Sequence, residues 1–307
     1  GLVAFHVERI GQLGGHAAAV YALAPGPGPS EIFSGSADKM VATWSLEAMA
    51  LQPLSIRLDQ TVYALCPIPE KGQLLVGTAT GSLHAIDLNA QQELRHLAFH
   101  NQGLFDVVYA APMEQIYALS ADGSLSVWDA RDFSLVQHIP LCEKKLRQAA
   151  WHEKTRHLAV AAGDGLTRIF STDNMHVAHA LPGHNGSVNA VAFHPTKPLL
   201  VTGGHDAHLR FWNTEDAYQA AGAIPAHNYA IYSIVFSPDG RFCATTSRDK
   251  TVKIWDANGF ELIARLDARH FRGHTHSVNK ALWVTHQNYL VTTGDDRTVM
   301  VWQVTET

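Results

Sequence analysis

The sequence is short of cysteine, charge and long apolar runs, and each shortage excludes a class of protein. Cys66, Cys142 and Cys243 are widely spaced without a CxxC pair, which argues against a disulfide framework or a zinc knuckle. We therefore expect reduced thiols in a cytoplasmic protein. Charged residues make up 17% of the 307 residues, and the net charge is −5 with no Lys/Arg run. This balance argues against nucleic-acid binding and polybasic membrane attachment. No apolar stretch approaches the roughly 18 residues of a membrane-spanning helix.

What the sequence does contain is an internal repeat. From His16 the chain runs 22 residues to Asp38 and six more to Trp44. The same spacing recurs at His100-Asp122-Trp128, His184-Asp206-Trp212, His227-Asp249-Trp255 and His274-Asp296-Trp302. The two gaps in this series hold weaker copies, namely Leu58-Thr80-Ile86 and Cys142-Asp164-Phe170. Seven repeats therefore begin near residues 16, 58, 100, 142, 184, 227 and 274. One insertion of about four residues lies around 267–270.

Each repeat contains short apolar stretches separated by turn residues. In the fifth repeat, residues 191–193, 199–202 and 209–212 have strand length, and the turn His194-Pro195-Thr196-Lys197-Pro198 separates the first two. Short strands at regular spacing predict an all-β chain. One four-stranded sheet cannot bury both of its faces, so neighbouring repeats must stack radially.

The period and the signature residues resemble those of the WD40-repeat family, whose best-known member is the β subunit of heterotrimeric G proteins. The WD dipeptide itself occurs at Trp128-Asp129 and Trp255-Asp256. The resemblance covers the whole chain and implies a single domain over residues 1–307. It would be a seven-bladed β-propeller of four-stranded antiparallel blades. Only five residues follow Trp302, so we expect the strand-like segment 4–10 to complete the last blade.

The resemblance also implies a buried hydrogen-bond chain of His, Ser or Thr, Asp and Trp in each blade. Four repeats carry all four members, which are His16, Ser34, Asp38, Trp44; His184, Thr202, Asp206, Trp212; His227, Thr245, Asp249, Trp255; and His274, Thr292, Asp296, Trp302. The third repeat has Ala118 at the hydroxyl position, so we expect its chain to be broken. The second and fourth repeats lack most members.

In this family the narrower top face of the propeller usually binds partners. The resemblance places its exposed positions three and five residues after the His position and one residue before the Asp position. The candidates for partner binding are Tyr21, Tyr63, Phe105, Lys145, Arg147, Asn189, His205, Tyr232, Arg248 and Asn279. Aromatic residues and Arg are enriched at interface hot spots, so these positions predict a protein- or peptide-binding surface. We expect a non-enzymatic, monomeric scaffold with an unidentified protein partner.

Two other readings of the same residues remain open. An enzyme or small-molecule site in the central channel would have to use Asn189, Asn279, His205 and Asp295, which form no known signature. Lys145 and Arg147 form a local basic patch, which leaves recognition of a lipid headgroup or RNA as a third alternative.

We predict neither a metal site nor a cofactor. The cluster His270, His274 and His276 lacks a carboxylate at a convincing spacing, and His274 already belongs to a repeat chain. The sequence also has no nucleophile elbow, no phosphate-binding loop and no HExxH motif. The Asp–His pairs recur once per repeat, which is typical of a structural role rather than a catalytic one.

Overall fold

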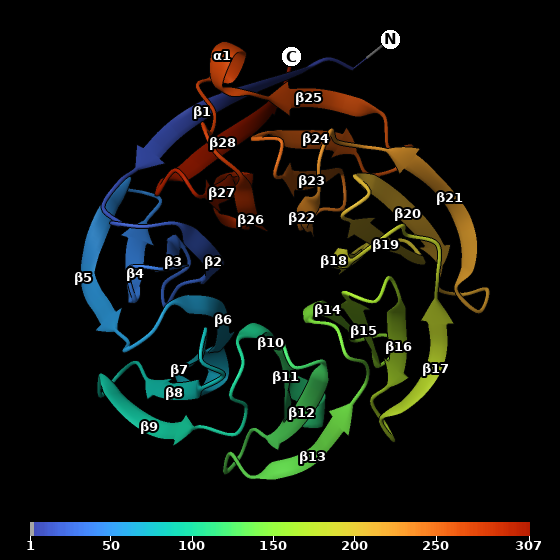
Figure 1. Ribbon diagram of the computed structural model, residues 1–307. Helices are drawn as coiled ribbons and strands as arrows, with labels where there is room; N and C mark the ends of the chain where they lie inside the picture. Colours follow the sequence, from blue (N-terminus) through green and yellow to red (C-terminus); the bar gives the residue numbers. More distant parts are fainter. Residues whose placement is uncertain (1–2) are drawn as a thin grey trace.

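The computed structural model describes residues 3–307, which form seven four-stranded antiparallel sheets around a central axis (Figure 1). This confirms the prediction of an all-β, seven-bladed propeller. Each blade contains one sequence repeat and is numbered here by that repeat. The extent of the domain over residues 1–307 stays a prediction, and Gly1 and Leu2 lie outside the described residues.

The strands are given from the axis outward. Blades 1 and 2 contain β2 (Val20–Pro25), β3 (Glu31–Ser36), β4 (Met40–Ser45), β5 (Ala50–Arg57), and β6 (Val62–Ile68), β7 (Gln73–Thr78), β8 (Leu83–Asp87), β9 (Gln92–Leu97). Blades 3 and 4 contain β10 (Leu104–Ala110), β11 (Gln115–Ser120), β12 (Ser124–Asp129), β13 (Leu135–Pro140), and β14 (Leu146–His152), β15 (His157–Ala162), β16 (Thr167–Ser171), β17 (His176–Leu181). Blades 5 and 6 contain β18 (Val188–Phe193), β19 (Leu199–Gly204), β20 (His208–Asn213), β21 (Gln219–Pro225), and β22 (Ile231–Phe236), β23 (Phe242–Ser247), β24 (Val252–Asp256), β25 (Leu262–Leu266). Blade 7 contains β26 (Val278–Trp283), β27 (Leu290–Gly294), β28 (Val299–Glu306) and β1 (Phe5–Leu13).

Few helices interrupt this architecture. Within residues 3–307 they are the short helix α1 (Ala268–Phe271) and three 3-10 turns, η1 (Pro69–Lys71), η2 (Ala111–Met113) and η3 (His286–Asn288). Helix α1 occupies the insertion noted in the sequence. Over the same residues, no helix has the length and apolar character needed to cross a bilayer.

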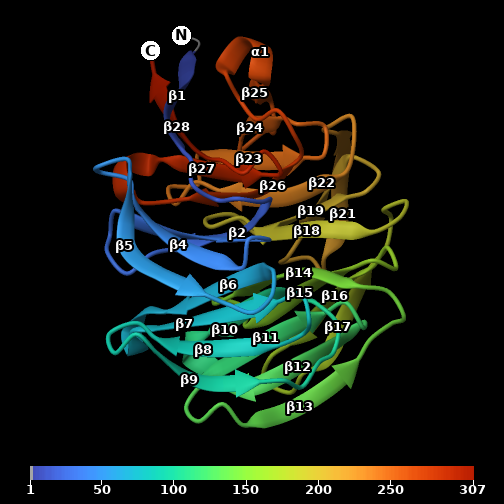
Figure 2. The same ribbon diagram turned by 60° about the vertical axis from the view of Figure 1, so that its left-hand side comes forward.

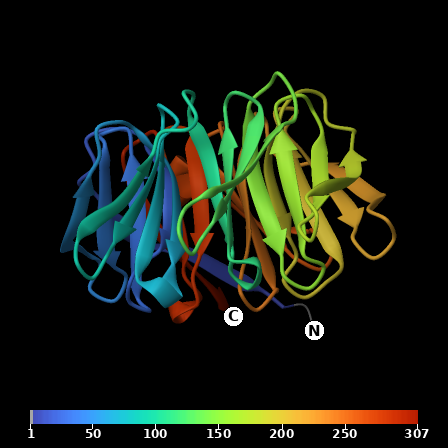
Figure 3. The ribbon, with the colours of Figure 1, turned by 90° about the horizontal axis from the view of Figure 1, so that it is seen from below.

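The ring closes without a covalent link between its ends. Strand β1 pairs antiparallel with β28, from Phe5 opposite Glu306 to Leu13 opposite Val299. The first and last described segments therefore share one sheet, and both ends emerge at the same edge of the disc (Figure 3). This confirms that the N-terminal segment completes the last blade. Arg9 on β1 also donates a 2.8 Å hydrogen bond to the carbonyl of Arg272, which follows α1.

The hydrophobic core is divided among the contacts between blades. Seven clusters of buried apolar residues occur in residues 3–307, one between each pair of neighbouring blades. The stacked faces of the blades are visible in Figure 2. The cluster at the closure between blades 7 and 1 includes Trp44, Val291 and Val301. The closure therefore has a core of the same kind as every other blade contact.

Four blades contain the full hydrogen-bond chain. In blade 1, Trp44 Nε1 donates to Ser34 Oγ at 2.7 Å, Ser34 Oγ lies 2.7 Å from His16 Nε2, and His16 Nδ1 lies 2.8 Å from Asp38 Oδ2. Because a carboxylate only accepts, Nδ1 carries the proton and Ser34 donates to Nε2. The equivalent bonds in blades 5, 6 and 7 measure 2.7–3.1 Å. Each chain links the aspartate in the turn between the second and third strands of a blade to the buried tryptophan of the same blade.

The expectation of a broken chain in blade 3 is wrong. Ser126 supplies the missing hydroxyl, since its Oγ lies 2.9 Å from His100 Nε2 and accepts from Trp128 Nε1 at 2.9 Å. Ser126 stands directly opposite Ala118 on the neighbouring strand. The hydroxyl therefore comes from the neighbouring strand, and the other members of the hydrogen-bond chain are in their usual places.

Blades 2 and 4 are held differently. In blade 4, Arg168 replaces the histidine as the partner of Asp164, with Nη2 2.6 Å from Oδ2. This ion pair holds the pKa of Asp164 below its usual value although desolvation opposes the shift. In blade 2, Thr80 occupies the Asp position and its Oγ1 lies 3.3 Å from that of Thr78.

Candidate partner-binding site at the channel mouth

A β-bulge recurs at the same point of every blade. In blade 1, Val20 pairs with Ser36 but Ala22 pairs with Gly35, so Tyr21 is the extra residue between them. A bulge re-aims side chains and bends its strand. The equivalent extra residues in the other six blades are Tyr63, Phe105, Arg147, Asn189, Tyr232 and Asn279. The series found five residues after each repeat start therefore coincides with a backbone feature.

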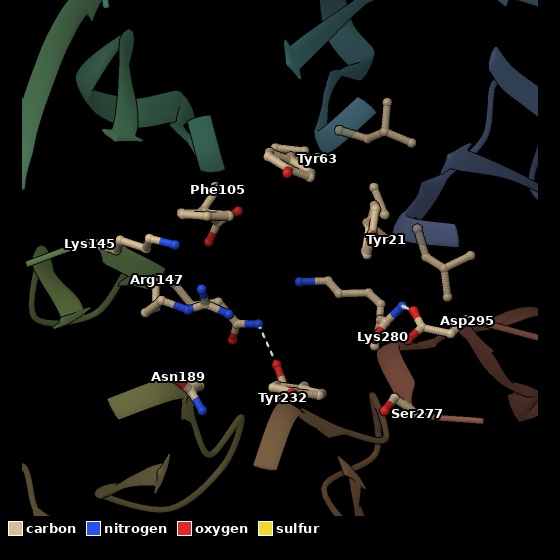
Figure 4. Close-up of a pocket in the computed structure, with 17 residues that line it drawn as sticks. Tyr21, Tyr63, Phe105, Lys145, Arg147, Asn189, Tyr232, Ser277, Lys280 and Asp295 are labelled. Atoms are coloured by element: carbon tan, nitrogen blue, oxygen red, sulfur yellow. Dashed lines mark hydrogen bonds between the residues drawn. The ribbon is translucent and has the colours of Figure 1, made fainter. Parts of the chain in front are cut away.

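These bulges surround a cavity at the mouth of the central channel (Figure 4). Its volume is about 410 Å³. Of the ten residues predicted to bind a partner, it brings together Tyr21, Tyr63, Phe105, Lys145, Arg147, Asn189, Tyr232 and Asn279. We refer to this space as the channel-mouth cavity.

The remaining two predicted residues lie outside the channel-mouth cavity. His205 lines an adjoining cavity of about 370 Å³, and the two cavities share Lys145, Arg147, Asn189 and Tyr232. Arg248 lies beside Tyr229, with its guanidinium carbon 5.9 Å from the centre of the ring. Tyr229 is 59% exposed and was not singled out in the sequence.

Aromatic rings form a continuous arc on one side of the channel-mouth cavity. Tyr21 meets Tyr63 edge to face with centroids 5.4 Å apart, and Tyr63 stacks on Phe105 at 5.1 Å. The arc ends in cations, because the Arg147 guanidinium carbon lies 4.7 Å and Lys145 Nζ 5.6 Å from the centre of the Phe105 ring. We refer to Tyr21, Tyr63 and Phe105 as the aromatic arc. It joins blades 1, 2 and 3 to the basic residues of blade 4.

Arg147 is the most unusual charged group in the cavity. Burial lowers its pKa, although the nearby hydroxyls of Tyr232 and Tyr63 act in the opposite direction. Its Nε is buried and has no hydrogen-bond partner in the part of the chain that the structure describes. A buried donor without an acceptor costs about 1–3 kcal/mol, so a ligand oxygen at this point would be favoured.

The side chains of the two asparagines at bulge positions form hydrogen bonds within the protein. Asn189 is 6% exposed; its amide donates to the Ile231 carbonyl at 3.1 Å and its side-chain oxygen accepts from Ser187. Asn279 donates to the Val20 carbonyl at 3.1 Å and to Asp295 at 2.8 Å. Each asparagine bridges to the next blade, so their local role is to hold the rim of the cavity together.

Sequence reasoning missed the second layer of the cavity. Asp106, Gln148 and Lys280 each follow a bulged residue directly, and all three line the cavity. In a regular strand neighbouring side chains point to opposite faces, so this layer could be found only by anticipating the bulge. Gln148 donates across the channel to the carbonyl of Tyr232 at 2.8 Å, as the dashed line in Figure 4 shows.

Asp106 is a half-buried carboxylate that already accepts hydrogen bonds from the fold. Burial raises its pKa, whereas the charge of Lys280 and the backbone donors act to lower it. Its two oxygens accept from the backbone N–H groups of Val107 and Ala149, both at 2.9 Å. Asp106 therefore joins blade 3 to blade 4 and leaves Lys280 free to project toward the cavity (Figure 4).

The four residues nominated for a channel enzyme do not meet in one space. Asn189, Asn279 and Asp295 line the channel-mouth cavity, whereas His205 lines the adjoining one. Both asparagines are already hydrogen-bonded within the rim, and Asp295 accepts from Asn279. This arrangement offers no free acid–base pair beside a nucleophile.

The histidine cluster near the insertion is likewise divided among separate bonds. His270 Nδ1 lies 2.8 Å from Asp267 Oδ2, and His274 Nδ1 lies 2.8 Å from Asp296 Oδ2. His276 Nδ1 lies 2.9 Å from the hydroxyl of Thr275. The three rings therefore have different partners.

Comparisons with known proteins agree with this architecture. The family model described as "WD domain, G-beta repeat" matches residues 7–45, 175–213, 219–256 and 267–303. The chain is 33% identical over 67 residues to the U5 small nuclear ribonucleoprotein 40 kDa protein of Homo sapiens, which is 22% of this chain and 19% of that protein. It is 24% identical over 246 residues to the protein of the same name from Dictyostelium discoideum, covering 63% of this chain and 69% of that protein.

A third relative is the WD repeat-containing protein 1 of Xenopus tropicalis, 23% identical over 155 residues, or 48% of this chain and 25% of that protein. The matched residues cover the three inner strands of blades 1, 5, 6 and 7 and the outer strands β1, β17 and β21. These matches and the seven-bladed ring show that the chain belongs to the WD40-repeat family.

Proposed function

We propose that the protein is a non-enzymatic interaction scaffold that binds a protein segment in the channel-mouth cavity. The observation that carries this proposal is the aromatic arc of Tyr21, Tyr63 and Phe105, which ends at Arg147, whose buried Nε has no hydrogen-bond partner among the described residues. Arginine and aromatic residues in a partly desolvated pocket are the usual anchors of a protein interface.

The relatives support this class of function. Their shared feature is the WD repeat, and the printed name of the human and Dictyostelium relatives makes them components of a ribonucleoprotein particle. Membership of a particle is consistent with a scaffold role, which we propose for this chain. The partner of this chain is an unidentified protein or peptide.

The experiment is an affinity capture from the organism of origin, read by mass spectrometry, with three baits. They are the wild type, a Tyr63→Ala/Arg147→Ala variant, and a Leu51→Ala/Val136→Ala control that trims two exposed apolar residues of outer strands. A partner captured by the wild type and the control but lost by the first variant supports the proposal. A partner retained by all three baits places the interface elsewhere and refutes it.

A further inference from the structure

We infer that the channel-mouth cavity recognises the carboxylate of an Asp or Glu side chain inserted by the partner, with an adjacent apolar side chain resting on the aromatic arc. This inference rests on the proposed function and names the chemical group that the scaffold recognises. Arg147 is its specificity-determining residue.

The channel-mouth cavity has more charged donors than acceptors. Three cations line the cavity, namely Lys145, Arg147 and Lys280. None of them has an ion-pair partner within 4.0 Å in residues 3–307, whereas six other Lys and Arg residues do. The cavity thus offers several charged donors and lacks a free anion to accept from them.

The two carboxylates that line the cavity, Asp106 and Asp295, already accept hydrogen bonds from the fold. Asp106 accepts two backbone N–H groups, and Asp295 accepts from the Asn279 amide. Neither carboxylate forms an ion pair with Arg147, whose guanidinium lies over the face of Phe105. An incoming carboxylate could take two parallel hydrogen bonds from the Arg147 fork, which is the strongest geometry for this pair.

The charge and volume of the channel-mouth cavity limit the group that it can bind. Three cations and two carboxylates line the cavity, so a ligand with one negative charge would balance its charge. A carboxylate carries one negative charge, whereas a phosphate monoester carries nearly two. A cationic side chain would meet Lys145, Arg147 and Lys280 and be repelled. The volume of about 410 Å³ leaves space for an acidic side chain and a neighbouring one, not for a folded element.

The aromatic arc provides a surface for an apolar side chain next to the acid. Tyr21, Tyr63 and Phe105 pack against one another in series and do not enclose a point charge as an aromatic cage would. Their shared surface borders the guanidinium directly. A peptide that places an aromatic or aliphatic side chain next to its acid would therefore cover both parts of the site at once.

The test uses a phage-displayed library of random nonapeptides, selected against the wild-type chain. Synthetic versions of the enriched peptides are then titrated against the wild type, Arg147→Gln, Lys280→Gln and the matched control Lys154→Gln. Lys154 is 80% exposed, lies in the turn between β14 and β15, and loses the same charge outside the cavity. Thermal midpoints measured alongside show that each variant is folded.

The inference predicts enriched peptides with an Asp or Glu next to an apolar residue. Arg147→Gln should weaken their binding by about tenfold or more, as loss of a charged hydrogen-bond pair implies, and Lys280→Gln by less. Lys154→Gln should leave the Kd unchanged, and replacing the acid of the peptide with its amide should reproduce the loss. If Arg147→Gln does not fold, Lys280→Gln and the amide peptide still decide the question.

Two outcomes separate this inference from the proposed function. Enriched peptides that lack an acid, or that bind Arg147→Gln as well as the wild type, overturn the inference. If those peptides are lost by Tyr63→Ala, the channel-mouth cavity is still the binding site. A selection that yields no peptide sensitive to Tyr63→Ala or to Arg147→Gln overturns both.

Discussion

The two halves of the ring are built on different principles. Blades 5, 6, 7 and 1, which flank the closure, all carry the full His–Ser/Thr–Asp–Trp chain. Blades 2, 3 and 4 on the far side have no such chain, a rerouted one and an Arg–Asp pair, respectively. Yet most of the aromatic arc and the basic residues at its end, Tyr63, Phe105, Lys145 and Arg147, come from the far side.

This contrast indicates a division of labour. A ring without a covalent link at its closure is most exposed to opening there, so buried hydrogen-bond chains in the flanking blades oppose unfolding where it would begin. The far blades are covalently continuous and can depart from the repeat pattern. The blades that depart from the repeat pattern are also the blades that supply most of the residues that we assign to partner binding. Four predictions, from the largest expected effect to the smallest, would break or sharpen this comparison.

The largest effect is expected from Asp249→Asn in blade 6. The Asp249 side chain is 3% exposed and holds His227, the Asn228 N–H and Thr251, so its loss should reduce the free energy of unfolding by about 1–3 kcal/mol. Asp164→Asn in blade 4 removes the ion pair with Arg168. Because the Asp164 side chain is 22% exposed, this change should reduce the free energy of unfolding by about 1 kcal/mol or less. Urea unfolding of both variants measures the difference, and equal losses would remove the distinction between the halves.

A second prediction concerns the rerouted chain of blade 3. Ser126→Ala leaves both His100 Nε2 and Trp128 Nε1 without their partner and should destabilise the protein by about 1–2 kcal/mol. Adding Ala118→Ser returns a hydroxyl to the position used by other blades, so the double variant should recover part of the loss. A thermal midpoint unmoved by Ser126→Ala would contradict the rerouting.

A third prediction concerns acid. Burial lowers the pKa of His184 and His227 below that of the unfolded chain, so the unfolded state binds more protons as the pH falls below about 6.5. Stability should therefore decline between about pH 7 and pH 5.

Below about pH 4 a second decline should follow. Asp206, Asp249 and Asp296 have lowered pKa values in the folded state, and their stabilisation is lost as they are protonated. Thermal midpoints recorded from pH 7 to pH 3 check both stages. A midpoint that rises on acidification to pH 5 would contradict the histidine part of the account.

The smallest effect is expected from the hydrogen bond between Arg9 on β1 and the segment that follows the insertion. Arg9→Ala removes a solvent-exposed bond to the carbonyl of Arg272, and should reduce the free energy of unfolding by about 0.5 kcal/mol. A matched change at Arg156, which pairs with Asp173 on the far half at 3.4 Å, serves as the control. A larger loss from Arg156→Ala than from Arg9→Ala would place the weak point of the ring outside its closure.

Most of the architecture could be read from the sequence because the repeat is periodic. The spacing of His16, Asp38 and Trp44 defines one blade, and its recurrence defines the ring and its closure. The rerouting through Ser126 was missed because a spacing rule inspects one position, whereas the hydroxyl can come from the residue opposite Ala118 on the neighbouring strand.

The candidate site divides in the same way. The aromatic arc and Arg147 lie at a fixed distance from each repeat start, so a position rule finds them. Lys280 and Asp106 depend on a bulge that breaks the alternation of the strand, which no local pattern announces. The engagement of Asn189 and Asn279 with neighbouring blades is a tertiary contact and could be seen only in the folded chain.

The most direct test of the central claim is hydrogen–deuterium exchange of the protein with and without its captured partner. The account predicts slower exchange in the segments that lead into the bulged strands, at residues 59–63, 101–105 and 143–147. It predicts no change in the outer strands β5, β9 and β13. Protection confined to those outer strands, with the channel-mouth segments unchanged, would contradict the assignment of partner binding to the channel-mouth cavity.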